Sequence, residues 1–193
     1  MTPVAGVDGC RAGWIVLHDG CATVHPDFAA VLAALPYDAV VAVDIPIGLI
    51  DEHVAGGREV DRAARVELGP KRSSVFSAPP RYALAARTLP DARRRGARLT
   101  LQTLNLLPRI EDVDGVMTPE LQSRVFEVHP ELSFAAMAGG SPVLTPKRTA
   151  AGDDLLDACA LAWSARRVAD GTASSLPHPP SLDARGLSME LHW

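Results

Sequence analysis

The sequence has few of the features that mark secreted, membrane-spanning or base-stacking proteins. Its three cysteines, Cys10, Cys21 and Cys159, are odd in number and form no CxxC pair, which favours free thiols in a reducing compartment. No stretch reaches the roughly 18 uninterrupted apolar residues of a membrane span, and no basic region precedes an apolar one at the N-terminus, so we expect no signal peptide. Aromatic residues make up 5% of the chain, which weakens the case for a stacking platform. We therefore expect a cytoplasmic protein.

The chain does contain enough apolar sequence for a substantial core. With 193 residues, 47% of them hydrophobic, we expect one domain over residues 1–193. Apolar runs bounded by turn residues predict strands, and longer alanine- and leucine-rich runs predict helices. The strands fall at residues 4–8, 14–17, 22–25, 39–44 and 125–128, and the helices at 28–35 and 153–169. Residues 49–124 are mostly helix and loop, residues 139–152 have the composition of a loop, and the proline-rich tail is expected to be extended.

Charge is distributed unevenly along the chain. Residues 58–98 hold eleven Lys or Arg and four Asp or Glu, a net charge of +7, whereas the rest holds eight basic and nineteen acidic residues, a net charge of −11. A basic segment beside an acidic pocket suits a protein that holds a phosphate backbone. A solvated helical face explains the same cluster. The excess of Arg over Lys, 17 to 2, fits bidentate phosphate binding or an alanine- and arginine-rich coding bias.

Two aspartates stand where predicted strands end, Asp8 in VAGVDG and Asp44 in VVAVDIPIG. An unpaired carboxylate in a buried strand costs several kcal/mol or is forced neutral, unless a metal ion or a positive group compensates it. Each aspartate alone is also explained by a local turn in which the side chain bonds the backbone. Two of them at the ends of strands that lie adjacent in a sheet favour a shared site.

Further acidic residues, Asp153, Asp154 and Asp157, lie in GDDLLDACALAW at the start of the last predicted helix. Capping and the helix dipole favour acids at the first positions, which explains Asp153, whereas for Asp154 capping and a ligand role fit the sequence equally well. Asp157 lies one turn after Asp154, past the capping positions, and faces the sheet if the apolar side of the helix does. We interpret Asp157 as a metal ligand with Asp154 in support. Carboxylates gathered in this way bind Mg²⁺ or Mn²⁺.

Glu127, in VFEVHPE, is a further candidate because it lies in a short predicted strand, although an outward-facing position on an edge strand is equally compatible with the sequence. In the basic segment, helical spacing places Arg58, Arg62 and Arg65 on one face. Lys71 and Arg72 precede two serines, a combination that can bind phosphate through side chains and turn amides. A solvated loop explains these two residues as well.

The sequence resembles the family known as domain of unknown function 429, which is regarded as a family of predicted RNase H-like nucleases. The resemblance rests on GVDGCRAGW, VDIPIGL, the run from Arg58 to Arg81 that contains RSSVF, EVHPELSF and DDLLDACALAWSARR, all in the order of the family and over nearly the whole chain. It implies an α/β fold of RNase H type, with a mixed five-stranded sheet flanked by helices. It also implies a large helical insertion, residues 49–124, between strands 4 and 5.

The resemblance also implies roles for single residues. Asp8 corresponds to the acid of the first strand and Asp44 to the acid after the fourth, and Asp157, with Asp154 before it, matches the acidic pair of the final helix. One departure concerns the segment after Lys147-Arg148-Thr149, which is shorter here than the family pattern, so that Gly152 leads directly into Asp153.

Three functions are compatible with the sequence. The leading hypothesis is a Mg²⁺- or Mn²⁺-dependent nuclease with Asp8, Asp44 and Asp157 as ligands, acting on DNA or RNA. The second is a nucleic-acid- or protein-binding module that keeps the fold without the chemistry. The third is a phosphoryl-transfer enzyme of the actin and sugar-kinase type, which needs a second domain of the same fold for which 193 residues leave no room.

Overall fold

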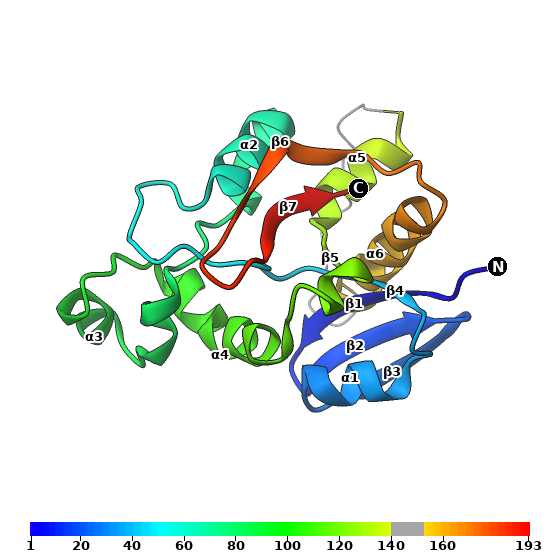
Figure 1. Cartoon of the computed structure of the whole chain (residues 1–193), viewed down its shortest axis with the longest axis horizontal. Helices are drawn as coiled ribbons and strands as arrows, with labels where there is room; N and C mark the ends of the chain where they lie inside the picture. The colour runs from blue at the N-terminus through cyan, green and yellow to red at the C-terminus, as the bar shows by residue number, and fades with distance from the viewer. Residues whose placement is uncertain (140–152) are drawn as a thin grey trace. The chain divides into compact units, whose positions relative to one another are not determined.

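The computed structural model describes residues 1–139 and 153–193 (Figure 1). The expected loop at 139–152 and the shortened segment before the last helix lie outside the described residues, apart from Gly139. The chain forms two compact units. The first comprises Met1–Ile45, Leu121–Ser175 and Leu191–Trp193, and the second comprises Pro46–Glu120 and Leu176–Glu190. Within the described part of the chain, no helix is long and apolar enough to cross a membrane.

The first unit is built on a mixed five-stranded sheet in the order β3-β2-β1-β4-β5, counted over the described residues (Figure 1). Strands β1, β2 and β3 form an antiparallel meander, and β4 and β5 run parallel to β1. The strands are β1 Val4–Cys10, β2 Gly13–His18, β3 Cys21–His25, β4 Val40–Val43 and β5 Val125–Glu127. The expected α/β fold with a mixed sheet is therefore confirmed, and the sequence between β4 and β5 is a largely helical insertion, as predicted.

The two faces of this sheet are covered by different helices. Ala5 and Val7 of β1, both fully buried, alternate with Gly6 and Asp8, which point to the opposite face. On the face of Ala5 and Val7, Trp14 packs edge-on against Phe28 of helix α1 Phe28–Ala34, with ring centroids 5.4 Å apart. Helix α6 Asp153–Ala169 covers the other face, and Leu161 and Ala165 join Ala42 and Val128 in its core.

The helix boundaries in this unit follow local chemistry. Asp27 caps α1 by accepting the amide hydrogen of Ala30 at 2.8 Å, as the sequence predicts. Helix α5 Pro130–Met137 follows β5 directly and begins with His129 as its cap, because His129 Nδ1 accepts the amide hydrogen of Glu131. Proline at the first position of α5 fits a site where no amide donor is needed.

The second unit contains the insertion and most of the C-terminal hairpin. Its helices are α2 Glu59–Leu68, the 3-10 helices η1 Gly69–Ser74 and η2 Arg81–Ala85, α3 Leu89–Arg94 and α4 Leu101–Val116. The tail forms strands β6 Ser175–Leu182 and β7 Ser188–His192, which pair with each other in a two-stranded sheet. The expectation of an extended tail is confirmed in conformation, but the sequence did not predict the hairpin.

An ionic cluster fixes the hairpin turn within the second unit. Asp183 accepts hydrogen bonds from the backbone of Leu49, Arg185 and Leu187 and from the guanidinium of Arg81 at 2.5 Å. Asp114 of α4 binds the same guanidinium at 3.0 Å and that of Arg185 at 3.1 Å. Burial opposes ionisation, but these hydrogen bonds lower the pKa of Asp183, so it is an anion held by fixed donors.

Candidate metal centre

The close approach of α6 to β1 creates the candidate site. A Cβ atom added to Gly6 would lie 2.0 Å from the carbonyl oxygen of Ala158 and 2.3 Å from the amide nitrogen of Ala162, so only glycine permits this packing. Asp8 lies two residues after Gly6 and therefore points to the same face of the strand. The glycine brings the helix onto the sheet, and the strand's alternation turns the aspartate towards the helix.

Asp8 is half-buried at the end of β1, and one of its oxygens accepts the Gly9 amide hydrogen at 2.7 Å. Burial raises the pKa of Asp8, and the negative charges of Asp44, Asp157 and Asp154 raise it further, to about 8, against the lowering effect of the Gly9 hydrogen bond. The groups that set this pKa are thus three carboxylates and one amide, with no basic side chain of the described residues among them. Among the described residues, the charges that act on Asp8 are therefore all negative.

Asp44 reaches this site because β4 is parallel to β1. Val7 pairs with Val43, and the Asp44 amide donates to the Val7 carbonyl oxygen at 3.3 Å, so the ladder extends by one residue beyond the strand. The carboxyl ends of parallel neighbours meet at one edge of the sheet, which sets Asp44 beside Asp8. The sequence-based expectation that the two aspartates lie on adjacent strands corresponds to this arrangement.

Helix α6 supplies the remaining two carboxylates from its first turns. Asp154 and Asp157 are both half-buried and lie three residues apart, on one side of the helix. Their charges reach Asp8, which places both near the end of β1. The residues that the sequence proposed from three separated segments therefore converge in the first unit.

The chemistry of these donors fits a hard divalent cation. All are carboxylate oxygens, the ligands that Mg²⁺ and Mn²⁺ favour, and the raised pKa of Asp8 marks negative charge that a cation would neutralise. Among the described residues, however, no three His, Cys, Asp or Glu side chains are grouped as a ready coordination shell. Mg²⁺ commonly keeps several waters and uses only one or two carboxylates, so the set provides ligands without a closed cage.

Glu127 is not brought together with the aspartates. It is buried and pairs with Val43 in the parallel ladder, and aligned residues of such a ladder share a face of the sheet. Val43 and Val7 point away from α6, so Glu127 points to the face opposite Asp8. His129, which follows it by two residues, acts as the cap of α5 and has a structural role here.

The three arginines expected to bind substrate are engaged within their own unit. Arg58 is 1% exposed, and its guanidinium donates to Asp61 at 2.7 Å and to the carbonyl oxygens of Ile47 and Gly48 at 3.0 and 3.1 Å. Arg62 donates to the Gly57 carbonyl oxygen, and Arg65 donates to Gly56, Val75 and Ser77. These contacts connect the segment 46–58 to α2 and to the chain after η1. Buried as it is, Arg58 does not present its guanidinium to solvent.

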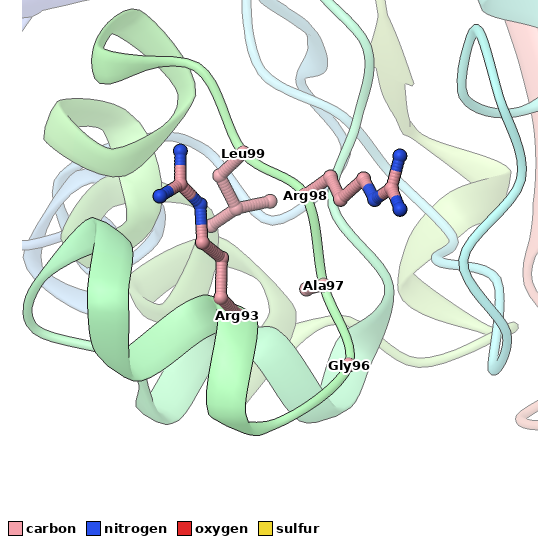
Figure 2. Close-up of a pocket in the computed structure, with 5 residues that line it drawn as sticks. All are labelled: Arg93, Gly96, Ala97, Arg98 and Leu99. Carbon is pink, nitrogen blue, oxygen red and sulfur yellow. The ribbon is translucent and has the colours of Figure 1, made fainter.

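Lys71 and Arg72 lie in η1, where Arg72 is exposed and Lys71 is half-buried. Sequence reasoning did not single out two further exposed arginines, Arg93 and Arg98, which line a cavity of about 620 Å³ in the second unit (Figure 2). The triple arginine at 93–95 followed by Gly96 was the available signal. It stood out only as part of the overall charge, because sequence alone cannot tell which arginines are engaged by internal partners.

Comparison with known proteins assigns the family. The family described as "Protein of unknown function (DUF429)" matches residues 6–153 and 148–182, a span that includes both strand-end aspartates and both helix aspartates. No curated protein and no solved structure matches the chain. The match covers most of the sequence. The chain therefore belongs to the domain of unknown function 429 family.

Proposed function

We propose that this protein is a metal-dependent nuclease that hydrolyses phosphodiester bonds at the carboxylate cluster of Asp8, Asp44, Asp154 and Asp157. The observation that carries the proposal is the convergence of these four acids from two strand ends and one helix, with no basic side chain of the described residues setting the Asp8 pKa. A protein keeps such an arrangement at a cost in stability, which a bound cation removes.

Each residue has a part in this scheme. Asp8, Asp44 and Asp157 would hold Mg²⁺ or Mn²⁺, and Asp154, one turn before Asp157, would orient bound water or a second ion. When bound, the metal supplies an activated water and charge stabilisation on the leaving oxygen. Asp8 has to lose its proton to act as a ligand, so cation binding should strengthen as the pH approaches about 8. The four aspartates are only partly buried, so solvent reaches the cluster.

The alternative is a binding module of the same fold that has no catalysis. It predicts that nucleic acid or protein binding persists without metal and after the aspartates become Asn. The absence of a closed three-residue cation shell among the described residues is the observation that favours it. The phosphoryl-transfer alternative would need an adenosine pocket and a second domain of the same fold. Over the described residues the chain has one five-stranded sheet of this kind.

The decisive experiment combines metal binding with activity. Mn²⁺ titration calorimetry is performed on wild type and on Asp8→Asn, Asp44→Asn and Asp157→Asn, each checked for folding by circular dichroism. The same proteins are then incubated with labelled single- and double-stranded DNA and RNA in Mg²⁺ or Mn²⁺. The proposal expects cleavage by wild type that EDTA abolishes, and a loss of about 100-fold or more in each variant. Cleavage that survives all three substitutions, or no cleavage of any substrate, would contradict it.

The exposed Asp38 lies in the same unit as the carboxylate cluster and offers a matched control substitution. Asp38→Asn removes one carboxylate charge from the surface of the unit and should leave both metal binding and cleavage within about twofold of wild type. Equal losses in Asp38→Asn and Asp157→Asn would mean that general charge, and not a metal site, governs the measurement.

A further inference from the structure

We propose that the turn between α3 and α4 is a binding site for the phosphate backbone of a nucleic-acid strand, with Arg93 and Arg98 as its anion-binding residues. The inference rests on the proposed function for the kind of polyanion, because a nuclease acts on a strand that carries consecutive phosphates. It concerns a part of the second unit that is separate in sequence from the aspartates.

Within the described part of the chain, the internal contacts of the basic segment leave three exposed arginines without a partner, Arg72, Arg93 and Arg98, of which Arg93 and Arg98 line the cavity. Arg58, Arg62, Arg65, Arg81 and Arg87 all donate to backbone carbonyl oxygens or carboxylates of their own unit. Arg93 and Arg98, by contrast, are exposed and have no side-chain hydrogen bond or ion pair to any residue that the structure describes. Within residues 89–98, four arginines face one acid, Asp91, so the local charge is +3.

The turn that presents the two arginines is rigidly closed. The Gly96 amide donates to the Arg93 carbonyl oxygen at 3.0 Å, and the Ala97 amide donates to that of Ala92 at 2.9 Å, the pair of bonds that defines a Schellman motif. Gly96 has φ 91°, a conformation that other residues rarely adopt, and both alanines are fully buried. The backbone that carries the two arginines is therefore fixed before any ligand arrives, although their side chains must still be ordered on binding.

The shape of the cavity favours a strand over a single small anion. Arg93, Gly96, Ala97, Arg98 and Leu99 line about 620 Å³, a volume in the range of sites for ligands much larger than one phosphate. In Figure 2 the guanidinium groups of Arg93 and Arg98 point to different sides of the turn, so we infer that a strand would contact them through different phosphates, which a single small anion could not do. Guanidinium binds phosphate oxygens in a bidentate manner, and Leu99 adds an apolar wall for a sugar or base.

Two neighbouring arginines provide an unusually close control. Arg94 and Arg95 are exposed, belong to the same helix end and carry the same charge, but each forms an ion pair with Asp91, at 3.2 and 3.3 Å, and neither lines the cavity. Two double variants can therefore be compared, Arg93→Gln/Arg98→Gln and Arg94→Gln/Arg95→Gln. Each removes two positive charges from the same surface. They differ in whether the lost groups line the cavity.

The test is fluorescence anisotropy of a labelled single-stranded oligonucleotide of about 12 nucleotides, as DNA and as RNA, in EDTA over a range of salt concentrations. We expect wild type to bind, and the Arg93→Gln/Arg98→Gln protein to bind about tenfold or more weakly, with a salt slope lower by about 1.4 for two lost phosphate contacts. The Arg94→Gln/Arg95→Gln protein should stay within about threefold of wild type. Equal weakening of both double variants, or no binding by folded wild type at low salt, would overturn the proposal.

A further variant separates this proposal from the nuclease. The Asp8→Asn/Asp44→Asn/Asp157→Asn protein, in the same EDTA buffer, should bind the oligonucleotide at least as tightly as wild type, because it loses negative charge and keeps both arginines. If wild type cleaves no substrate while this binding pattern holds, the nuclease proposal fails and the strand-binding site stands. If cleavage depends on the aspartates while both double arginine variants bind like wild type, the strand-binding site fails alone.

Discussion

Asp8 should make the first unit less stable as the pH rises, and replacing it with Asn should remove this effect. The folded-state pKa of Asp8 is raised to about 8 from an ordinary value of 3.8, by burial and by the charges of Asp44, Asp157 and Asp154. Between these two pH values the folded protein binds a proton that the unfolded chain has released. The free energy of unfolding therefore falls as the pH increases from about 4 to about 8, and the destabilisation is complete above pH 8.

The magnitude follows from the two pKa values. A difference of about 4 at about 1.4 kcal/mol per pH unit sets a ceiling of about 6 kcal/mol. Because Asp8 is only half-buried, water and local relaxation reduce this, and we expect about 2–3 kcal/mol at pH 8.5. Asp8→Asn keeps an oxygen that can accept the Gly9 amide hydrogen, so it removes the charge without removing that bond.

The measurement is urea unfolding followed by tryptophan fluorescence at several pH values between 4.5 and 9, in EDTA. Trp14, Trp163 and Trp193 all lie in the first unit, so the signal reports the unit that contains Asp8. Asp8→Asn should match wild type near pH 4.5 and exceed it in stability near pH 8.5, whereas the exposed-site control Asp38→Asn should follow wild type throughout. Curves for Asp8→Asn and wild type that run parallel over the whole range would refute the reasoning.

Three further predictions follow from the packing and the ionic contacts. Gly6→Ala should destabilise the first unit by about 3 kcal/mol or more, measured by the same urea unfolding, because its Cβ would overlap the α6 backbone. Gly115→Ala in α4 of the second unit, with open space around it, should be neutral or stabilising when unfolding is followed by circular dichroism. In thermal unfolding at pH 8, Mn²⁺ at about 100 times its dissociation constant should raise the free energy of unfolding of wild type by about 2.7 kcal/mol. The same concentration should stabilise Asp8→Asn far less. Asp183→Ala should lower the free energy of unfolding of the second unit by about 3 kcal/mol and speed proteolysis within it, because Arg81 and three backbone amides lose the carboxylate that accepts their hydrogen bonds. Unchanged proteolysis would contradict a stabilising role of Asp183.

The elements of the first unit were predictable because local signals and packing agree there. The apolar run VVAV at 40–43, rich in β-branched residues, favours a strand buried on both faces, and Asp27 caps α1 where the apolar pattern begins. The hairpin β6–β7 was missed because Pro177, Pro179 and Pro180 argue against a strand. Proline is excluded from the interior of strands that pair with a neighbour on each side, whereas β6 pairs only with β7 and can therefore hold prolines.

The candidate site was predictable to a different degree in each of its parts. Asp8 and Asp44 could be placed together because parallel strands bring their carboxyl ends to one edge. The orientation of Glu127 depends on register, since a shift of one residue in the ladder reverses the face, and no sequence signal fixes it. Arg58 could have been recognised as internal from Asp61 three residues later, the spacing of a capping box, but burial of the pair emerges only from tertiary packing.

The contrast among the buried and half-buried acids is the strongest reason to regard the Asp8 cluster as functional. Asp61 is buried against the guanidinium of Arg58, and Asp183 against that of Arg81, so each of these carboxylates has its countercharge within the second unit. The fold can therefore compensate a buried acid with arginine where only stability matters. At Asp8 it instead adds three more carboxylates, and Gly6 lets the helix that carries two of them approach closely. Because this arrangement raises the energy of the folded state, a ligand of positive charge is the simplest physical reason for it.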